Sequence, residues 1–138
     1  MNYLTYAIIG LFAYSLVAPL VKLGIKDVPV EAAVVITNSF LVLFTVIWAV
    51  VRQKNVLNYI TFEKSSVYLY LAGVALGIGI LSYYMALDAG EVSRVVPIFG
   101  LYLALSSIYG FFLLGEAITV TKILGLGLAV ISIVLVSW

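Results

Sequence analysis

Five stretches of the chain contain no charged residue, and short segments that hold the charges separate them. The stretches comprise residues 3–21, 32–51, 65–87, 95–115 and 123–138. Each is 16 to 23 residues long, close to the roughly 20 residues that carry an α-helix across about 30 Å of hydrocarbon. The pattern predicts an all-α membrane protein with five transmembrane helices in a single domain over 1–138, at about 3–22, 30–51, 65–87, 93–115 and 118–138.

Other classes of protein fit this pattern poorly. A transmembrane β-barrel would alternate apolar and polar residues, whereas residues 34–36 and 79–81 are unbroken apolar runs. With 65% hydrophobic and 9% charged residues, the chain is more apolar than a soluble domain. The first stretch lacks a basic n-region and is too long for a cleavable signal peptide, so we expect it to remain in the mature chain.

The charges specify the orientation in the membrane only weakly. All seven basic and six acidic residues lie between the stretches or close to their ends. Four basic residues fall on the N-terminal side and three on the other: Arg52, Lys54, Lys64 and Lys122 against Lys22, Lys26 and Arg94. A difference of one decides little under the positive-inside rule. Either the N-terminus lies in the cytoplasm, or the chain inserts both ways and pairs with itself antiparallel.

The sequence offers little catalytic chemistry. It contains no cysteine and no histidine, and it has no Gly-rich phosphate loop and no paired catalytic carboxylates. A net charge of +1 gives no reason to expect binding to nucleic acid. We therefore expect no enzyme activity, no cofactor, no metal site and no nucleic-acid partner.

A few polar side chains lie inside the apolar stretches, where lipid cannot satisfy them. Asn38 carries an amide that should face a wet cavity as a ligand, or a neighbouring helix as a hydrogen-bond partner. Tyr84 follows Tyr83, and because adjacent helical residues point about 100° apart, at most one of them should face a central space. Tyr102 and Ser106 lie too deep in the fourth helix to be interface anchors.

Prolines and glycines mark local features of the predicted helices. Pro19 removes the helical donor for the carbonyl of Ser15 and should kink the first helix, either as part of a gate or as an ordinary feature of membrane helices. Pro97 is expected in the first turn of the fourth helix, where its missing N–H costs nothing. Gly73 and Gly77 form a GxxxG pattern whose expected role is close helix packing.

The end of the fourth helix is predicted to be a tight turn. Gly115 can end that helix in a left-handed conformation, and Glu116 near the start of the fifth helix would complement its dipole. This interpretation is preferred to an ion-binding role for Glu116. The fifth helix, with Gly125 and Gly127, is expected to serve packing or dimerisation rather than substrate binding.

Three segments of the second half form a specific series: residues 90–98 (GEVSRVVPI), 111–119 (FFLLGEAIT) and 123–127 (ILGLG). The series resembles the C-terminal half of an EamA domain, the five-helix unit of the drug/metabolite transporter superfamily. Residues 3–27 resemble the first helix of that unit, so the resemblance covers essentially the whole chain. It implies a transporter, because typical members carry two such units with inverted halves around a cavity and export or exchange small metabolites.

The resemblance also implies a partner, because this chain has one such unit. We expect an antiparallel homodimer or a paralogous partner chain in the opposite orientation. The related four-helix small multidrug resistance proteins use a carboxylate in their first helix, but Tyr14 stands at the corresponding position here. Proton-coupled cation export of that kind is therefore not expected.

These observations predict an exporter or exchanger of a small metabolite in the plasma membrane, working as a dimer by alternating access. The expected substrate-binding residues are Tyr14, Asn38, Tyr84, Tyr102 and Ser106 in the cavity, with Glu91 and Arg94 at its mouth. Two other functions stay open, namely a non-transporting membrane subunit of a hetero-oligomer and half of a lipid-carrier flippase.

Overall fold

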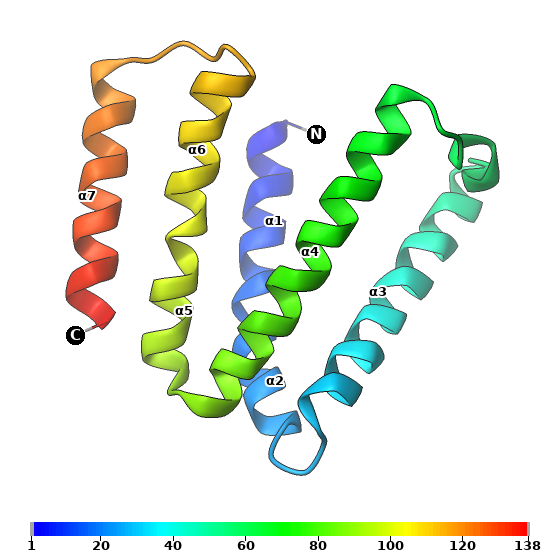
Figure 1. The fold of residues 1–138 in the computed structure, drawn as a ribbon, viewed down its shortest axis with the longest axis horizontal. Coiled ribbons are helices and arrows are strands. Elements are labelled where there is room, and N and C mark those ends of the chain that lie inside the picture. Colours follow the sequence, from blue (N-terminus) through cyan, green and yellow to red (C-terminus); the bar gives the residue numbers. More distant parts are fainter. Residues whose placement is uncertain (1, 138) are drawn as a thin grey trace. The chain divides into compact units, whose positions relative to one another are not determined.

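The computed structural model describes residues 2–137, and every regular element in that range is a helix (Figure 1). The elements are α1 (Tyr3–Ser15), α2 (Val17–Gly24), α3 (Val30–Val51), the short 3-10 helix η1 (Val56–Tyr59), α4 (Lys64–Ala89), α5 (Val92–Gly100), α6 (Tyr102–Leu113) and α7 (Val120–Ser137). A single residue separates α1 from α2 and α5 from α6, so each pair corresponds to one predicted helix. The predicted end of the last helix at 138 lies outside the described residues.

Four of these helical segments are long and apolar enough to cross a bilayer. They are Tyr3–Gly24, Val30–Val51, Lys64–Ala89 and Val92–Leu113, with 22 to 26 residues each. The fifth segment, α7, has 18 residues and is therefore about 27 Å long, slightly less than the roughly 30 Å of a bilayer core. Most large apolar side chains point outward, where lipid can cover them. The chain is an integral, multi-pass, all-α membrane protein.

Prolines explain the interruptions in two of the predicted helices. Because Pro19 has no N–H, the carbonyl of Ser15 lacks a helical donor, and α1 ends at Ser15. Pro97 is the sixth residue of α5, so the expectation that it lies in the first turn was wrong by about one turn. It deprives the carbonyl of Ser93 of its donor in the same way, and α5 ends at Gly100.

The connection from α6 to α7 begins with a glycine in the left-handed conformation. Gly115 has a φ of 66°, which other residues adopt only at a cost, so its predicted role in ending the helix is confirmed. The carbonyl of Gly110 accepts a hydrogen bond from the N–H of Glu116 (3.2 Å). At the other end of the connection, Oγ1 of Thr119 accepts from the N–H of Lys122 (3.3 Å) and caps α7.

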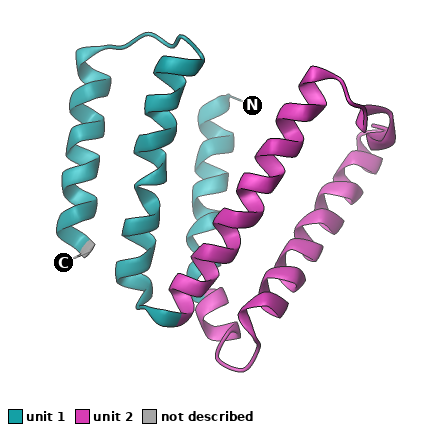
Figure 2. Cartoon of the chain, in the orientation of Figure 1, with its two compact units in different colours: residues 1–19, 89–138 teal, residues 20–88 magenta. Residues whose placement is uncertain are grey.

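The chain divides into two compact units, residues 1–19 with 89–138 and residues 20–88 (Figure 2). In the first unit α5 packs against α7, and a Cβ atom added at Gly100 would lie 3.9 Å from Cδ1 of Ile133. The rings of Phe99 and Tyr102 lie 5.3 Å apart where α5 passes into α6.

In the second unit, α3 and α4 run antiparallel and are joined by a loop that contains η1 (Figure 1). The hydroxyl of Ser66 donates to the carbonyl of Tyr59 (3.0 Å), which holds this loop against the start of α4. Near the other end of α4, the hydroxyl of Tyr84 donates to Oγ1 of Thr37 (3.0 Å) and links α4 to α3.

Lys22 of α2 donates hydrogen bonds to carbonyl groups at the C-terminal end of α4, in the same unit. Nζ of Lys22 donates to the carbonyls of Leu87 and Asp88, the second over 3.2 Å. The last carbonyls of a helix have no helical donor, and a positive charge at that end complements the helix dipole. Lys22 therefore ties α2 to the end of α4, beside the fully buried side chain of Leu87.

Candidate functional site

A groove of about 460 Å³ runs between α3 and α4 in the second unit. Each helix contributes residues that recur every three or four positions, which places them on one helical face. The lining residues are Glu31, Val34, Val35 and Asn38 from α3, and Gly73, Leu76, Gly77, Ile80 and Leu81 from α4.

The two glycines of the GxxxG pattern keep this groove open. A Cβ atom added at Gly73 or at Gly77 would meet no other atom within 4 Å. Within the described residues, no helix of the same copy packs closely over this pair, so the packing role expected from the pattern is not seen inside one copy. The missing side chains instead leave room along the α4 wall of the groove.

Asn38 is the last of the α3 residues that line the groove, and Glu31 is the first. The Asn38 side chain is half-buried, and Nδ2 donates to the carbonyl of Val34 one turn earlier in the same helix (2.8 Å). A carboxamide has two N–H donors and an acceptor oxygen, so this bond leaves one donor and the oxygen for another molecule. Glu31, two turns earlier, places a carboxylate at the end of the groove.

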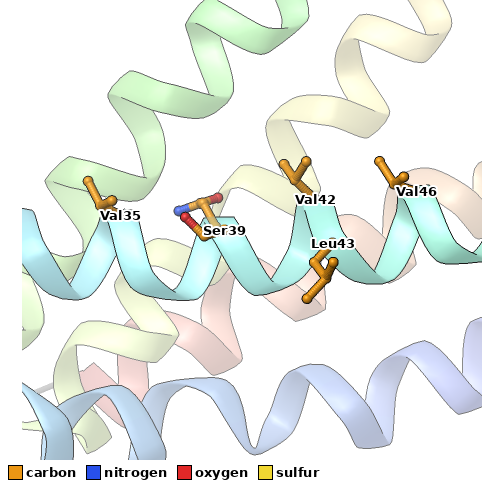
Figure 3. Close-up of a pocket in the computed structure, with 6 residues that line it drawn as sticks. Val35, Ser39, Val42, Leu43 and Val46 are labelled. Atoms are coloured by element: carbon orange, nitrogen blue, oxygen red, sulfur yellow. The ribbon is translucent and has the colours of Figure 1, made fainter.

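A second concavity of about 580 Å³ lies along the neighbouring face of α3 (Figure 3). Figure 3 shows Val35, Val42 and Val46 projecting to the same side of the helix. The full lining, all from α3, is Val35, Asn38, Ser39, Val42, Leu43 and Val46. Asn38 thus lies on the border of both concavities.

The structure distributes the other predicted site residues unevenly. Tyr84 is 2% exposed and bonded to Thr37, and it is not among the residues that line the two concavities of α3. Tyr14, Tyr102 and Ser106 belong to the first unit, and all three side chains are exposed.

Glu91 and Arg94 lie close together at the start of α5. Oε2 of Glu91 lies 3.6 Å from Nε of Arg94, and both side chains are largely exposed. An exposed pair of this kind contributes little to stability, so both groups remain accessible to a charged ligand. Among the described residues, no three His, Cys, Asp or Glu side chains come together as a metal site.

Sequence reasoning missed two features of this region. Glu31 lies seven positions before Asn38, a spacing that puts both on one face of α3, so periodicity could have identified it. The contact of Lys22 with the carbonyls of α4 carries no local signal, because its acceptors lie 65 and 66 residues further along the chain.

Comparison with known proteins places the chain in a family. The sequence model of the EamA-like transporter family matches residues 1–138, which confirms the resemblance. A protein from Sinorhizobium sp named "Uncharacterized transporter in cobO 3'region" is 28% identical over 127 residues, covering 87% of this chain and 85% of that protein. No solved structure matches the chain. The chain belongs to the EamA-like transporter family and is a membrane transporter.

Proposed function

We propose that two copies of the chain form one transporter, which moves a small polar or amphipathic metabolite across the plasma membrane by alternating access. The position of Asn38 carries this proposal. It lies eight residues after the start of α3, about 12 Å along the helix, and borders two open concavities. A polar group at this depth that faces open space is typical of a substrate contact.

The lining of the α3–α4 groove favours an amphipathic substrate. Its polar groups are the Asn38 amide and, at one end, the Glu31 carboxylate, while the other lining side chains are apolar or absent. A substrate with one polar end would pair with the amide and place its apolar part against the remaining wall. Sites for small molecules commonly combine mostly apolar walls with a few placed polar groups.

The concavity on α3 supports a dimer. All of its lining residues come from one helix, so another surface has to close it before it can exclude water from a substrate. A second copy in the opposite orientation would supply that surface and create the inverted symmetry of many transporters. The Sinorhizobium transporter matches over 85% of its length, so a protein of similar size bears the name of a transporter.

A two-stage experiment tests this function. The purified chain in detergent is first screened by thermal shift against a panel of polar and amphipathic metabolites. Compounds that raise the melting temperature of the wild type, but not that of Asn38→Ala, are then tested for counterflow in liposomes that contain this chain alone. We expect at least one such compound to accumulate in the liposomes.

Thr45→Ala is the matched control for the screen. Thr45 also bonds only to carbonyls of its own helix, at Leu41 and Val42, and it does not line the groove. It should therefore keep the wild-type response. Compounds that bind at Asn38 but cross only when another protein is added would contradict the proposal and favour a non-transporting subunit. Stabilisation by lipid carriers alone would favour the flippase half.

A further inference from the structure

A second polar groove lies in the first unit, where α6 ends and α7 begins. It has a volume of about 320 Å³, near the lower end of the roughly 300–1,000 Å³ typical of small-molecule sites. Its lining comprises Ser107 and Phe111 from α6, Glu116 from the connection, and Lys122, Gly125 and Leu126 from α7. The groove thus combines one positive and one negative side chain with apolar walls.

The ammonium group of Lys122 is held in place by two contacts. Nζ donates to the carbonyl of Ala117 (2.9 Å) and lies 5.5 Å from the centre of the Phe111 ring. An ammonium group has three N–H donors, so the bond to Ala117 leaves donors for an anion in the groove. The ring of Phe111 also orients the charge without neutralising it.

The carboxylate of Glu116 lies against α6 at Gly110. A Cβ atom added at Gly110 would lie 3.3 Å from both Cδ and Oε2 of Glu116, so the missing side chain of Gly110 makes room for the carboxylate. Among the described residues, none donates a hydrogen bond to this carboxylate. A ligand with N–H donors can therefore bind to it.

The position of the groove points to a lipid. It lies at the adjoining ends of two apolar helices, which places it at the level of the lipid headgroups. Phe111 and Leu126 line the same groove and continue into the apolar surfaces of α6 and α7. A bound molecule with a charged head and acyl chains would match both parts of this surface.

We propose that this groove binds the headgroup of a phospholipid with a primary ammonium group, such as phosphatidylethanolamine. The phosphate would accept hydrogen bonds from Lys122, and the ammonium would donate to Glu116. A choline headgroup has no N–H to donate, and the Phe111 ring that could contact it already faces Lys122. A phosphatidylglycerol headgroup offers no cation to Glu116. Only the ammonium phospholipid combines a phosphate for Lys122 with a positively charged N–H donor for Glu116.

Native mass spectrometry tests this site on the whole chain. The purified protein is titrated with phosphatidylethanolamine, phosphatidylglycerol and phosphatidylcholine that carry identical acyl chains. We expect the wild type to retain phosphatidylethanolamine about tenfold more tightly than either other lipid, as the loss of one charge-assisted contact implies. Equal retention of all three, or tightest binding of phosphatidylglycerol, would overturn the proposal.

Three variants assign the contacts. Glu116→Gln should abolish the preference for phosphatidylethanolamine over phosphatidylglycerol, whereas Lys122→Gln should weaken the binding of both lipids. Gly110→Ala should act like Glu116→Gln, because its methyl group would displace the carboxylate from α6. Glu63→Gln, which also removes an acidic charge from the N-terminal side, is the matched control and should leave the preference unchanged. A preference that persists in Glu116→Gln would also refute the site.

Discussion

At the scale of single residues, Asn38 and Tyr84 of the second unit differ in whether their hydrogen bonds connect two helices. The Asn38 amide donates to the carbonyl of Val34 in its own helix, so this bond does not connect α3 to another helix. Tyr84 is almost fully buried and its hydroxyl reaches Thr37 on α3, so it joins two helices. Removing these groups should therefore affect transport and stability differently.

We expect Asn38→Ala to reduce transport strongly and to leave the melting temperature close to that of the wild type. Tyr84→Phe should instead lower the stability by about 1 kcal/mol, because it removes one hydrogen bond between α4 and α3. Thermal unfolding in one detergent and initial rates of counterflow separate the two effects. A melting temperature that falls as far in Asn38→Ala as in Tyr84→Phe would identify Asn38 as a structural residue.

The contact of Lys22 with the end of α4 predicts a specific loss of stability. Lys22→Met should cost about 1–3 kcal/mol, since it removes charge-assisted hydrogen bonds to carbonyls that the helix cannot satisfy. Lys26→Met is the control, because Lys26 is exposed one turn further along the chain. Chemical or thermal unfolding of both variants provides the measurement. Equal stability of the two proteins would show that the contact does not hold α4.

At the scale of helices, most of the fold could be predicted from the sequence. Charge-free stretches and charged connections located all five helical segments, because a charge in the bilayer is costly wherever the helix packs. Pro19 correctly indicated an interruption in the first helix. Pro97 was placed in the first turn because the charge-free stretch begins at residue 95, whereas α5 begins three residues before that, at Val92, so the proline lies inside the helix and interrupts it.

The candidate site was predicted only in part. The sequence identified Asn38 because an amide in hydrocarbon needs a partner wherever it lies. It did not reveal the groove, because the distance between α3 and α4 depends on contacts such as Tyr84 with Thr37 that connect distant positions. The distance between α3 and α4 also decides whether a neighbouring helix packs against Gly73 and Gly77.

The turn after α6 predicts a stability effect at a single glycine. Gly115→Ala should destabilise the protein by about 1 kcal/mol, because alanine is strained at a φ of 66°. Gly79→Ala is the matched control, since Gly79 lies within helical α4 and an added Cβ would meet no atom within 4 Å. The control should be neutral or stabilising. Thermal unfolding that ranks Gly79→Ala as the less stable variant would contradict this account of the turn.

At the scale of the whole molecule, the proposed dimer also needs close contact between helices of the two copies, and we propose the open face of α7 for it, in addition to the α3 surface. Ile133 lies on the face of α7 that packs against α5 at Gly100, whereas an added Cβ at Gly127 would meet no atom within 4 Å, so Gly127 marks an open part of the helix surface. Gly127→Leu should therefore weaken self-association about tenfold, by preventing the close approach of another helix. Analytical ultracentrifugation in detergent measures this, with Gly10→Leu on α1 as the control. An unchanged dimer in Gly127→Leu would place the interface elsewhere.

The central claim is that two copies in opposite orientations make one transporter. Asn55 precedes η1 and Ala89 ends α4, so the two positions lie at opposite ends of a membrane-spanning helix. The chain contains no cysteine, so Asn55→Cys and Ala89→Cys can each be labelled on intact cells with an impermeant maleimide. We expect partial labelling at both positions, because each then faces outward in a fraction of the copies. Complete labelling at one position and none at the other would contradict the antiparallel homodimer.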